Sequence, residues 1–284
     1  MKPVLHHLRR RAPLAGAVLA AVAATALSLG AGGAAAAPTW APAATATIHP
    51  GVQTFTAGAQ CTANFVYTDG TNVYLGQAAH CSGTGGSTDT DGCTSGSLPV
   101  GTEVTVTGAS KPGVLAYNSW LTMQQLGETD ANTCAYNDLA LIKIDPADVG
   151  KVNPSIPFFG GPIGLNTAGT ALGDKVYSYG NSELRGGIAQ LSPKRGISLG
   201  DDAGGWTHTV YTVTPGIPGD SGSAFVDANG KALGILSTVA IAPLAGSNGV
   251  GDVGKELAYA NSTGGLGITL AQGTEAFTGP LLPI

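Results

Sequence analysis

Short runs of alternating apolar and polar residues recur along most of the chain, and each run ends at Gly, Asn or Asp. This pattern predicts β-strands joined by tight turns. The Asn229-Gly230 pair between two such runs predicts a hairpin with a primed turn. Helical periodicity is confined to residues 268–277, so one short C-terminal helix is expected. The predicted strands cover residues 64–67, 73–75, 103–107, 115–123, 138–144, 175–179, 210–214, 223–226 and 233–236.

The strand pattern begins near His49 and leaves about 235 residues for an all-β fold, which is enough for two barrels or sandwiches. The Pro/Gly-rich stretch 153–164 is the expected junction between a first unit at about 49–150 and a second at about 165–284. Residues 37–48 are rich in Ala, Pro and Thr, so we expect a tail, a linker or a short pro-segment that buries no core.

The composition excludes several classes of protein. With 43% hydrophobic and 11% charged residues, 44 Gly and 17 Pro, the chain is too apolar for intrinsic disorder and too poor in charge for a coiled coil. The first 36 residues hold four of the thirteen basic groups and no acid, so the remainder has a net charge of 9 − 18 = −9. Such a chain lacks the basic surface that binds nucleic acid, and no nucleic-acid partner is expected.

The N-terminus has the three parts of a secretory signal peptide. Cleavage is expected after Ala36, since cutting one residue later would leave Pro38 at the new N-terminus. The sixteen-residue apolar run is shorter than the ~20 residues of a spanning helix, although an uncleaved anchor is the alternative. We therefore predict a signal peptide at 1–36 and a secreted, extracellular protein without a membrane segment after cleavage. Its basic, apolar and small-residue parts are 2–11, 14–29 and 34–37.

An even number of cysteines in a secreted chain favours disulfides over free thiols. Three pairings of the four are possible. No Cys-x-x-Cys pair is present, so zinc ligation is disfavoured and no metal is expected. The cysteines are Cys61, Cys81, Cys93 and Cys134.

Three short segments each hold one residue of a possible nucleophilic triad: GQAAHC at 76–81, NDLALI at 137–142 and PGDSGS at 218–223. A serine such as Ser221 is a weak nucleophile and needs a base within hydrogen-bond reach, with a third group to orient that base. Histidine, with an unperturbed pKa of ~6.5, suits the role of base, for which His80 is the candidate, with Asp138 as the orienting group.

Glycines around Ser221 permit a tight turn in which the backbone N–H groups of Gly219 and Ser221 converge on one point, an oxyanion hole. Taken singly, each residue also has a structural interpretation, as a Gly-rich turn, a strand-end histidine or a turn aspartate. The order His, Asp, Ser along the chain restricts the class of enzyme that could hold such a triad. The α/β-hydrolases run Ser, Asp, His, whereas this chain has no histidine after Ser221, and subtilisin-like enzymes run Asp, His, Ser.

The segments AAHC, NDLALI and GDSGS resemble those of the chymotrypsin (trypsin-like) serine peptidases, in particular secreted bacterial members of actinomycete type. The resemblance extends from about Ala59 to Leu270. It implies two antiparallel six-stranded β-barrels packed face to face, with the active site in the cleft. His80 and Asp138 would come from the first barrel and Ser221 from the second. A Cys61–Cys81 bridge would match the family's histidine-loop disulfide, leaving Cys93 with Cys134.

The chain departs from the family pattern at two places. Nothing like the Ile-Val-Gly-Gly N-terminus of animal members precedes the barrel, so Asp220 needs another partner, for which the arginines of the second half are candidates. An aspartate six residues before the serine selects basic residues in the family, but here Pro215 stands there, so no basic preference is expected. The β-branched Val239 suggests a narrow pocket for small residues. The arginines are Arg185 and Arg195, and the predicted pocket is Pro215, Ser237, Thr238 and Val239.

The remaining candidates are expected to be structural. Asp89 and Asp91 hint at calcium but lack further ligands, so a solvated turn is favoured. Asp201 and Asp202 are expected at the surface, and His208 as a satisfied structural histidine. The sequence therefore predicts a monomeric secreted serine endopeptidase without a cofactor, acting on proteins or peptides through an acyl-enzyme. The alternatives are a catalytically silent protein-binding module on a peptidase scaffold and an esterase.

Overall fold

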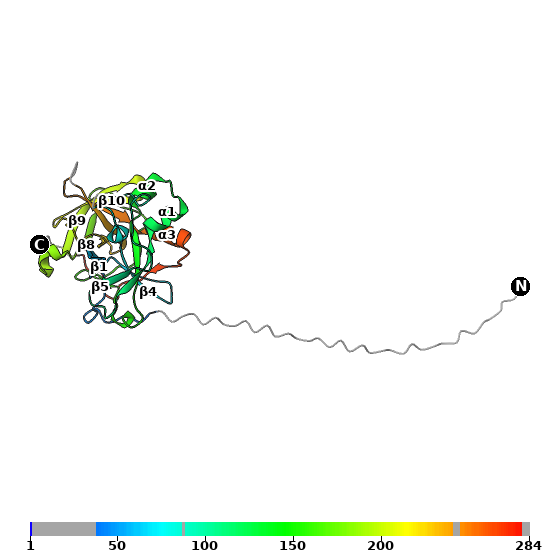
Figure 1. The fold of residues 1–284 in the computed structure, drawn as a ribbon, viewed down its shortest axis with the longest axis horizontal. Helices are drawn as coiled ribbons and strands as arrows, with labels where there is room; N and C mark the ends of the chain where they lie inside the picture. Colours follow the sequence, from blue (N-terminus) through cyan, green and yellow to red (C-terminus); the bar gives the residue numbers. More distant parts are fainter. Residues whose placement is uncertain (2–37, 87–88, 241–244, 280–284) are drawn as a thin grey trace. The chain divides into compact units, whose positions relative to one another are not determined.

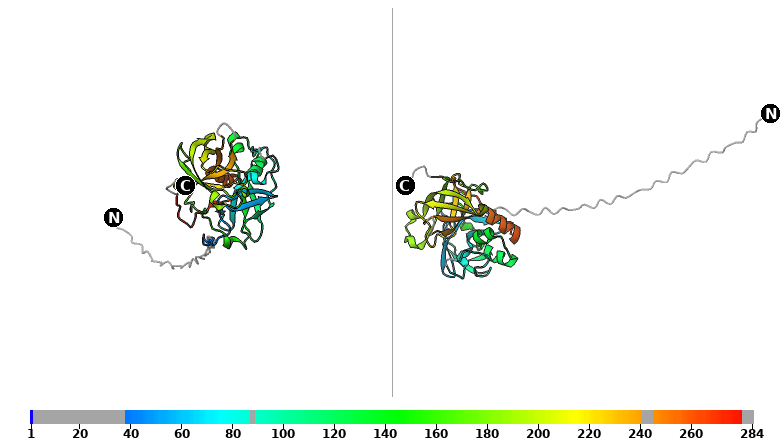
Figure 2. Two further views of the ribbon diagram at one scale, coloured as in Figure 1. Left: turned by 90° about the vertical axis from the view of Figure 1, so that its left-hand side faces the viewer. Right: turned by 90° about the horizontal axis from the view of Figure 1, so that it is seen from above.

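The computed structural model describes Met1 and residues 38–86, 89–240 and 245–279. Apart from Met1, the predicted signal peptide lies outside these residues. All elements below belong to the unit that begins at Ala35. Figure 1 shows their order along the chain, and Figure 2 gives two further views of the same β-rich body.

Eight antiparallel strands form the first sheet, in the order β14-β3-β4-β7-β6-β5-β1-β2. Where six strands were expected, the first unit contributes seven, β1 to β7, and the eighth, β14, comes from the interval assigned to the second unit and pairs with β3. The strands are β1 Gln53–Thr56, β2 Ala59–Thr62, β3 Val66–Thr68, β4 Val73–Ala78, β5 Glu103–Val106, β6 Gly113–Asn118, β7 Leu139–Lys143 and β14 Thr269–Leu270.

Six antiparallel strands close into a second barrel, in the order β10-β13-β12-β11-β8-β9, as predicted. The hairpin at Asn229-Gly230 joins β11 to β12, and Gly230 has φ +79°, a value that favours glycine. Six buried apolar side chains form a hydrophobic cluster in this barrel. The strands are β8 Lys175–Tyr179, β9 Pro193–Asp202, β10 Thr207–Thr212, β11 Ala224–Asp227, β12 Ala232–Val239 and β13 Asn248–Asp252, and the core is Val176, Val210, Phe225, Leu233, Leu236 and Val250.

The predicted helix at 268–277 is wrong, because this segment contains β14 and no helix. The C-terminal helix is instead α3 (Val253–Gly264), which begins where the Asp252 side chain accepts the Lys255 N–H at 2.7 Å. Helix α1 (Ser119–Leu126) interrupts the strand predicted at 115–123. The chain contains α2 (Ala131–Tyr136) and the 3₁₀ turns η1 Ala79–Ser82, η2 Val149–Lys151, η3 Glu183–Arg185, η4 Ala189–Leu191 and η5 Ala203–Gly205.

The stretch before His49 packs on the first sheet, contrary to the expectation that it buries no core. Trp40 is packed against the apolar cluster of that sheet, and Ile48 is fully buried. Ile48 also pairs with Val152 in a parallel bridge, and Asn153 Nδ2 donates to the Ala41 carbonyl at 2.6 Å. Two large apolar side chains therefore fix a segment whose composition is otherwise that of a linker.

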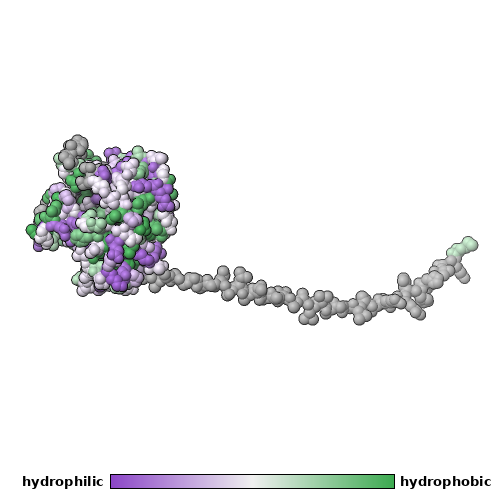
Figure 3. Space-filling view, in the orientation of Figure 1, coloured by the Kyte–Doolittle hydropathy of each residue, from purple (hydrophilic) through white to green (hydrophobic). Residues whose placement is uncertain are grey.

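One apolar cluster contains residues of both the first sheet and the closed barrel, so the two β-structures share a continuous interface. It includes Tyr67 of the first sheet, Phe159 of the junction, Tyr177 of the barrel and Leu257 of α3. None of the helices in the described ranges is long and apolar enough to cross a membrane. In Figure 3 hydrophobic residues lie along the left edge of the view, the side on which β8 and β9 are labelled in Figure 1.

Candidate active site

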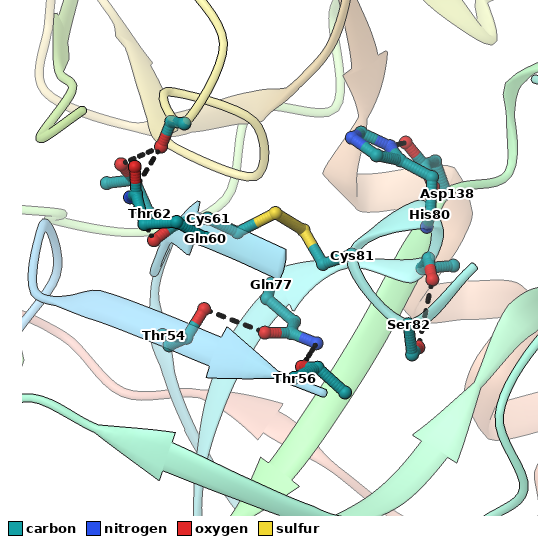
Figure 4. The surroundings of a disulfide bond; sticks show 12 residues. Thr54, Thr56, Gln60, Cys61, Thr62, Gln77, His80, Cys81, Ser82 and Asp138 are labelled. Carbon is teal, nitrogen blue, oxygen red and sulfur yellow. Dashed lines mark hydrogen bonds and ion pairs between the residues drawn. A yellow bond between two sulfur atoms is a disulfide. The ribbon is translucent and has the colours of Figure 1, made fainter. Parts of the chain in front are cut away.

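His80 and Asp138 lie at the ends of paired strands. His80 is in η1 directly after β4, and Asp138 precedes β7, which pairs with β4 through Ala78 and Leu139. His80 Nδ1 lies 2.7 Å from Asp138 Oδ2, and the His80 backbone N–H donates to Oδ1 at 2.9 Å. One hydrogen bond from the ring and one from the backbone thus hold His80 against a single carboxylate, and Figure 4 shows the two residues side by side. An Nδ1–H directed at Asp138 leaves Nε2 as the basic nitrogen.

The charge state of His80 is set by opposing effects. Burial lowers the pKa of the imidazole, but the charge of Asp138 and the hydrogen bond to it raise the pKa by more, so the net direction is upward. The pair therefore stabilises the imidazolium that forms when Nε2 takes a proton. That is the requirement for a general base acting on a hydroxyl group.

Two further groups hold Asp138, and sequence reasoning assigned neither of them to it. Ser237 Oγ donates to Asp138 Oδ2 at 2.6 Å, so this residue, expected in the pocket, contacts the carboxylate. Glu256 of α3 is fully buried, and its Oε1 accepts the Asp138 backbone N–H at 2.9 Å. Burial, with Asp138 and Asp252 nearby, raises the pKa of Glu256 well above its usual value, which favours the neutral form of this carboxyl.

Asp220 finds its partners within the second unit. Its carboxylate contacts the Arg185 guanidinium and lies 2.9 Å from Lys194 Nζ, and both cations are buried. Burial raises the pKa of Asp220, but the two cations lower it by more, so the acid is ionised. Of the two candidate arginines, Arg185 is confirmed, whereas Arg195 lies over the ring of Phe158.

Lys194 is the partner of Asp220 that sequence reasoning missed. A single lysine in a polar stretch carries no signal of burial, yet its side chain is only 1% exposed. Its amine also donates to the Pro215 carbonyl at 3.1 Å, so the same cation holds both Asp220 and the residue that precedes the loop 216–223.

The backbone N–H groups of the serine loop, residues 216–223, divide into two sets. Those of Gly216, Ile217, Asp220, Gly222 and Ser223 each donate to an acceptor within the chain, and Pro218 has none to donate. The N–H groups of Gly219 and Ser221 have no acceptor in the part of the chain that the structure describes. The two donors expected from the motif are therefore the two that are free to bind an incoming oxygen.

Strand β2 connects this loop to His80. Thr62 Oγ1 donates to the Gly219 carbonyl at 2.7 Å, and the Thr62 N–H donates to the Ser221 carbonyl at 2.9 Å. The neighbouring Cys61 is bonded to Cys81, the residue after His80, as expected (Figure 4). The second predicted pairing, of the two remaining cysteines, is also confirmed: Cys93–Cys134.

Gly222 shows how close the loop lies to β4. With φ +84° it adopts a conformation that favours glycine, and a Cβ there would lie 2.7 Å from the Ala78 nitrogen, two residues before His80. Among the described residues no hydrogen bond joins Ser221 Oγ to His80, and in enzymes without substrate this bond is often long. The fold thus brings the three candidate segments to one place.

The predicted pocket walls lie against each other. A Cβ on Gly216 would lie 3.2 Å from Val239 Cγ2, so little space separates the start of the serine loop from the end of β12. Asn248 Oδ1 accepts the Gly216 N–H at 2.9 Å and fixes that wall. Pro215 directs its carbonyl at Lys194, and Thr238 lies beside Val239 on β12.

The other candidates have structural partners. His208 is fully buried, with its nitrogens 2.6 Å from Asp201 and 3.1 Å from Asp252, and is a satisfied histidine as expected. The carboxylates of Asp89 and Asp91 accept backbone N–H groups of their own turns. In the described ranges, both groups of side chains close enough to share a metal ion contain disulfide-bonded cysteines, which are not thiolate ligands.

Comparisons with known proteins identify the fold. No protein-family model matches the sequence, and a search of curated proteins finds no match. Thermobifida fusca Protease A is similar in structure, with a TM-score of 0.51 and 18% identity over 80% of this chain and 99% of that one. A glutamic acid-specific serine protease that uses a histidine triad in substrate binding has the same TM-score and identity, over 79% of this chain and all of its own.

These two structures define the class of fold. It is the two-barrel fold of the chymotrypsin-like serine proteases. The all-β architecture that the resemblance implied is therefore confirmed. At 18% identity the likeness concerns the fold, and function has to be argued from the site.

Proposed function

We propose that this protein is a secreted serine endopeptidase that hydrolyses peptide bonds through an acyl-enzyme intermediate. The observation that carries the proposal is that the N–H groups of Gly219 and Ser221 have no acceptor among the described residues, whereas every other N–H group of the loop has one. An ordinary Gly-rich turn has no reason to leave these two donors free beside a His–Asp pair. An oxyanion hole requires it.

In the proposed mechanism Ser221 Oγ attacks the substrate carbonyl while His80 Nε2 takes its proton. Asp138 orients the ring and stabilises the imidazolium. The oxygen of the tetrahedral intermediate accepts from the N–H groups of Gly219 and Ser221. Collapse expels the amine, which takes the proton from His80, and leaves an ester on Ser221. Water activated by His80 then hydrolyses that ester and restores the serine.

The pocket residues favour a small apolar side chain before the cleaved bond. Val239 lies against Gly216, which narrows the pocket, and Asp220 is committed to buried cations, so no free carboxylate awaits a basic residue. His208 is sealed between two carboxylates, and so it does not offer substrate the kind of group used by the glutamate-specific protease. A substrate panel in which Arg or Phe is cleaved faster than Ala or Val would contradict this preference.

The proposal includes export and activity without a second cleavage. The signal-like N-terminus and two disulfides support an extracellular location, and the protein is proposed to act as a monomer. Because Arg185 and Lys194 already neutralise Asp220, no newly cut N-terminus is needed to order the serine loop. The segment containing Trp40 is packed on the first sheet, so we place it in the mature domain.

Labelling with a serine-reactive fluorophosphonate tests the proposal without knowledge of the substrate. We expect one adduct, located on Ser221 by peptide mass spectrometry and absent from Ser221→Ala. The buried Ser198→Ala variant is the matched control and should label normally. A folded, disulfide-intact protein that does not label would instead support the silent protein-binding module, and faster turnover of esters than of any peptide would support the esterase.

A further inference from the structure

The direction of the Gly219 N–H is decided by the carbonyl of the preceding residue. Pro218 C=O and Gly219 N–H belong to one trans peptide group, in which they point in opposite directions. The Pro218 carbonyl accepts a hydrogen bond from Ser182 Oγ at 2.5 Å. The N–H therefore points away from Ser182, toward the side where the tetrahedral oxygen would form.

The hydrogen-bond partners of Ser182 fix which way its proton points. Its Oγ accepts the Leu184 N–H at 3.1 Å, and a backbone N–H can only donate. The Pro218 carbonyl can only accept, so the hydroxyl proton has to lie between Ser182 and Pro218. Ser182 is 2% exposed, and its own N–H donates to Asp220 Oδ1 at 3.1 Å, which holds its backbone against the serine loop.

Without this hydroxyl the peptide group has an alternative orientation. Gly219 has φ +94° and no Cβ, so it can rotate where another residue could not. A rotated peptide would turn the Pro218 carbonyl toward the place meant for the oxyanion and remove the N–H from it. Two negative oxygens would then face each other, which reverses the electrostatic effect of the site.

We propose that Ser182 is a positioning residue for oxyanion stabilisation, because its hydroxyl holds the Pro218–Gly219 peptide with the N–H directed at the reacting carbonyl. The inference rests on the proposed peptidase function. It assigns a role to a residue that lies 39 positions before Ser221 and outside the three sequence motifs.

The test compares Ser182→Ala, Ser182→Thr and Ser198→Ala in the full secreted chain. Thr restores the hydroxyl. Ser198 is an equally buried serine of the same barrel, bonded to Gly200 and Thr170. Active sites are counted by fluorophosphonate labelling, so that kcat is expressed per labelled molecule. Affinity for a peptide aldehyde, which forms a tetrahedral adduct, is measured alongside KM, and a crystal structure of Ser182→Ala reports the orientation of the peptide.

Loss of one fixed donor predicts that Ser182→Ala lowers kcat per labelled site by about 10- to 100-fold, somewhat less than complete removal of an oxyanion donor. Aldehyde affinity should fall by a similar factor while KM changes less than about twofold. Ser182→Thr should recover most of the rate, and Ser198→Ala should match the parent protein.

The inference is overturned if Ser182→Ala keeps its kcat within about twofold, or if its peptide has the same single orientation as the parent. Failure of the proposed function looks different. In that case the unmutated protein itself neither labels nor cleaves peptides, and the crystal structure of Ser182→Ala still decides whether Ser182 sets the peptide orientation.

Discussion

The neutral carboxyl of Glu256 should make the folded protein less stable as pH rises. Its pKa is raised well above 4.5 in the folded state, whereas an unfolded chain leaves it near 4.5. Between these two values the folded state binds more protons than the unfolded state, so the free energy of unfolding falls with increasing pH. The stabilising contribution is complete below pH 4.5 and is lost as pH climbs toward the folded pKa.

The magnitude follows from the distance between the working pH and 4.5. Each pH unit above 4.5 costs about 1.4 kcal/mol for as long as the folded group stays protonated, so the loss of stability should be smallest at pH 5 and largest at pH 7. Glu256→Gln is neutral at every pH, and its amide oxygen can still accept the Asp138 N–H. This variant should therefore be more stable than the parent, by an amount that grows with pH.

Urea unfolding at pH 5, 6 and 7, with disulfides intact, measures the effect as a difference between the two proteins. Other titrating groups are common to both and cancel. Glu103→Gln, which removes an exposed carboxylate from β5, is the control for loss of one acid. A stability difference between Glu256→Gln and the parent that is the same at all three pH values would refute the reasoning, because it would mean that Glu256 is ionised in the folded protein.

Three further predictions concern the site. Asp220→Asn leaves two buried cations without their carboxylate and should destabilise the protein by about 3 to 5 kcal/mol in urea unfolding, with loss of labelling. Asp138→Asn should lower kcat about 10⁴-fold in peptide assays, and in the parent the acid limb of kcat/KM should lie above pH 6.5, since the pKa of His80 is raised. Replacing Cys61 and Cys81 by Ala opens a loop with a sequence separation of 20 and should cost about 3 kcal/mol of unfolding free energy, checked by thermal melts under non-reducing conditions.

Local signals in the sequence were sufficient for most strands, the Asn229-Gly230 hairpin and the all-β class, whereas the two-barrel architecture followed from the family resemblance. Each of these depends on neighbours a few residues apart, or on motifs with fixed spacing. The pairing of Cys61 with Cys81 followed from the resemblance and is confirmed. The candidate triad could also be named from sequence, because its residue types and order restrict the possible chemistry.

Helices were predicted less well because their beginnings depend on single capping side chains. Asn118 ends a strand-like run by accepting the Trp120 N–H at 2.8 Å, which begins α1 within a segment that otherwise favours strand. Helix α3 contains glycines at 254 and 264 and several polar residues, so its periodicity is weak. Asp252 caps its first turn and thereby places Glu256 behind Asp138.

The charged residues that sequence reasoning missed share one physical cause. A lysine or glutamate in isolation indicates a solvated surface, and only the tertiary fold reveals that Lys194 faces Asp220 and that Glu256 faces Asp138. Asp220 is ionised because two cations approach it. Among the described residues Glu256 receives one N–H and no cation, so its neutral form is favoured.

The charge state of Glu256 affects His80, the proposed general base. A charge on Glu256 would add a second anion behind Asp138 and raise the pKa of His80 further, so that at a given pH a larger fraction of the imidazole would be protonated and unable to accept a proton from Ser221. Keeping Glu256 uncharged therefore lets the fold brace the Asp138 backbone without disturbing the proton affinity of His80. An amide at position 256 would serve equally well, whereas an aspartate, one methylene shorter, would withdraw the acceptor from the Asp138 N–H.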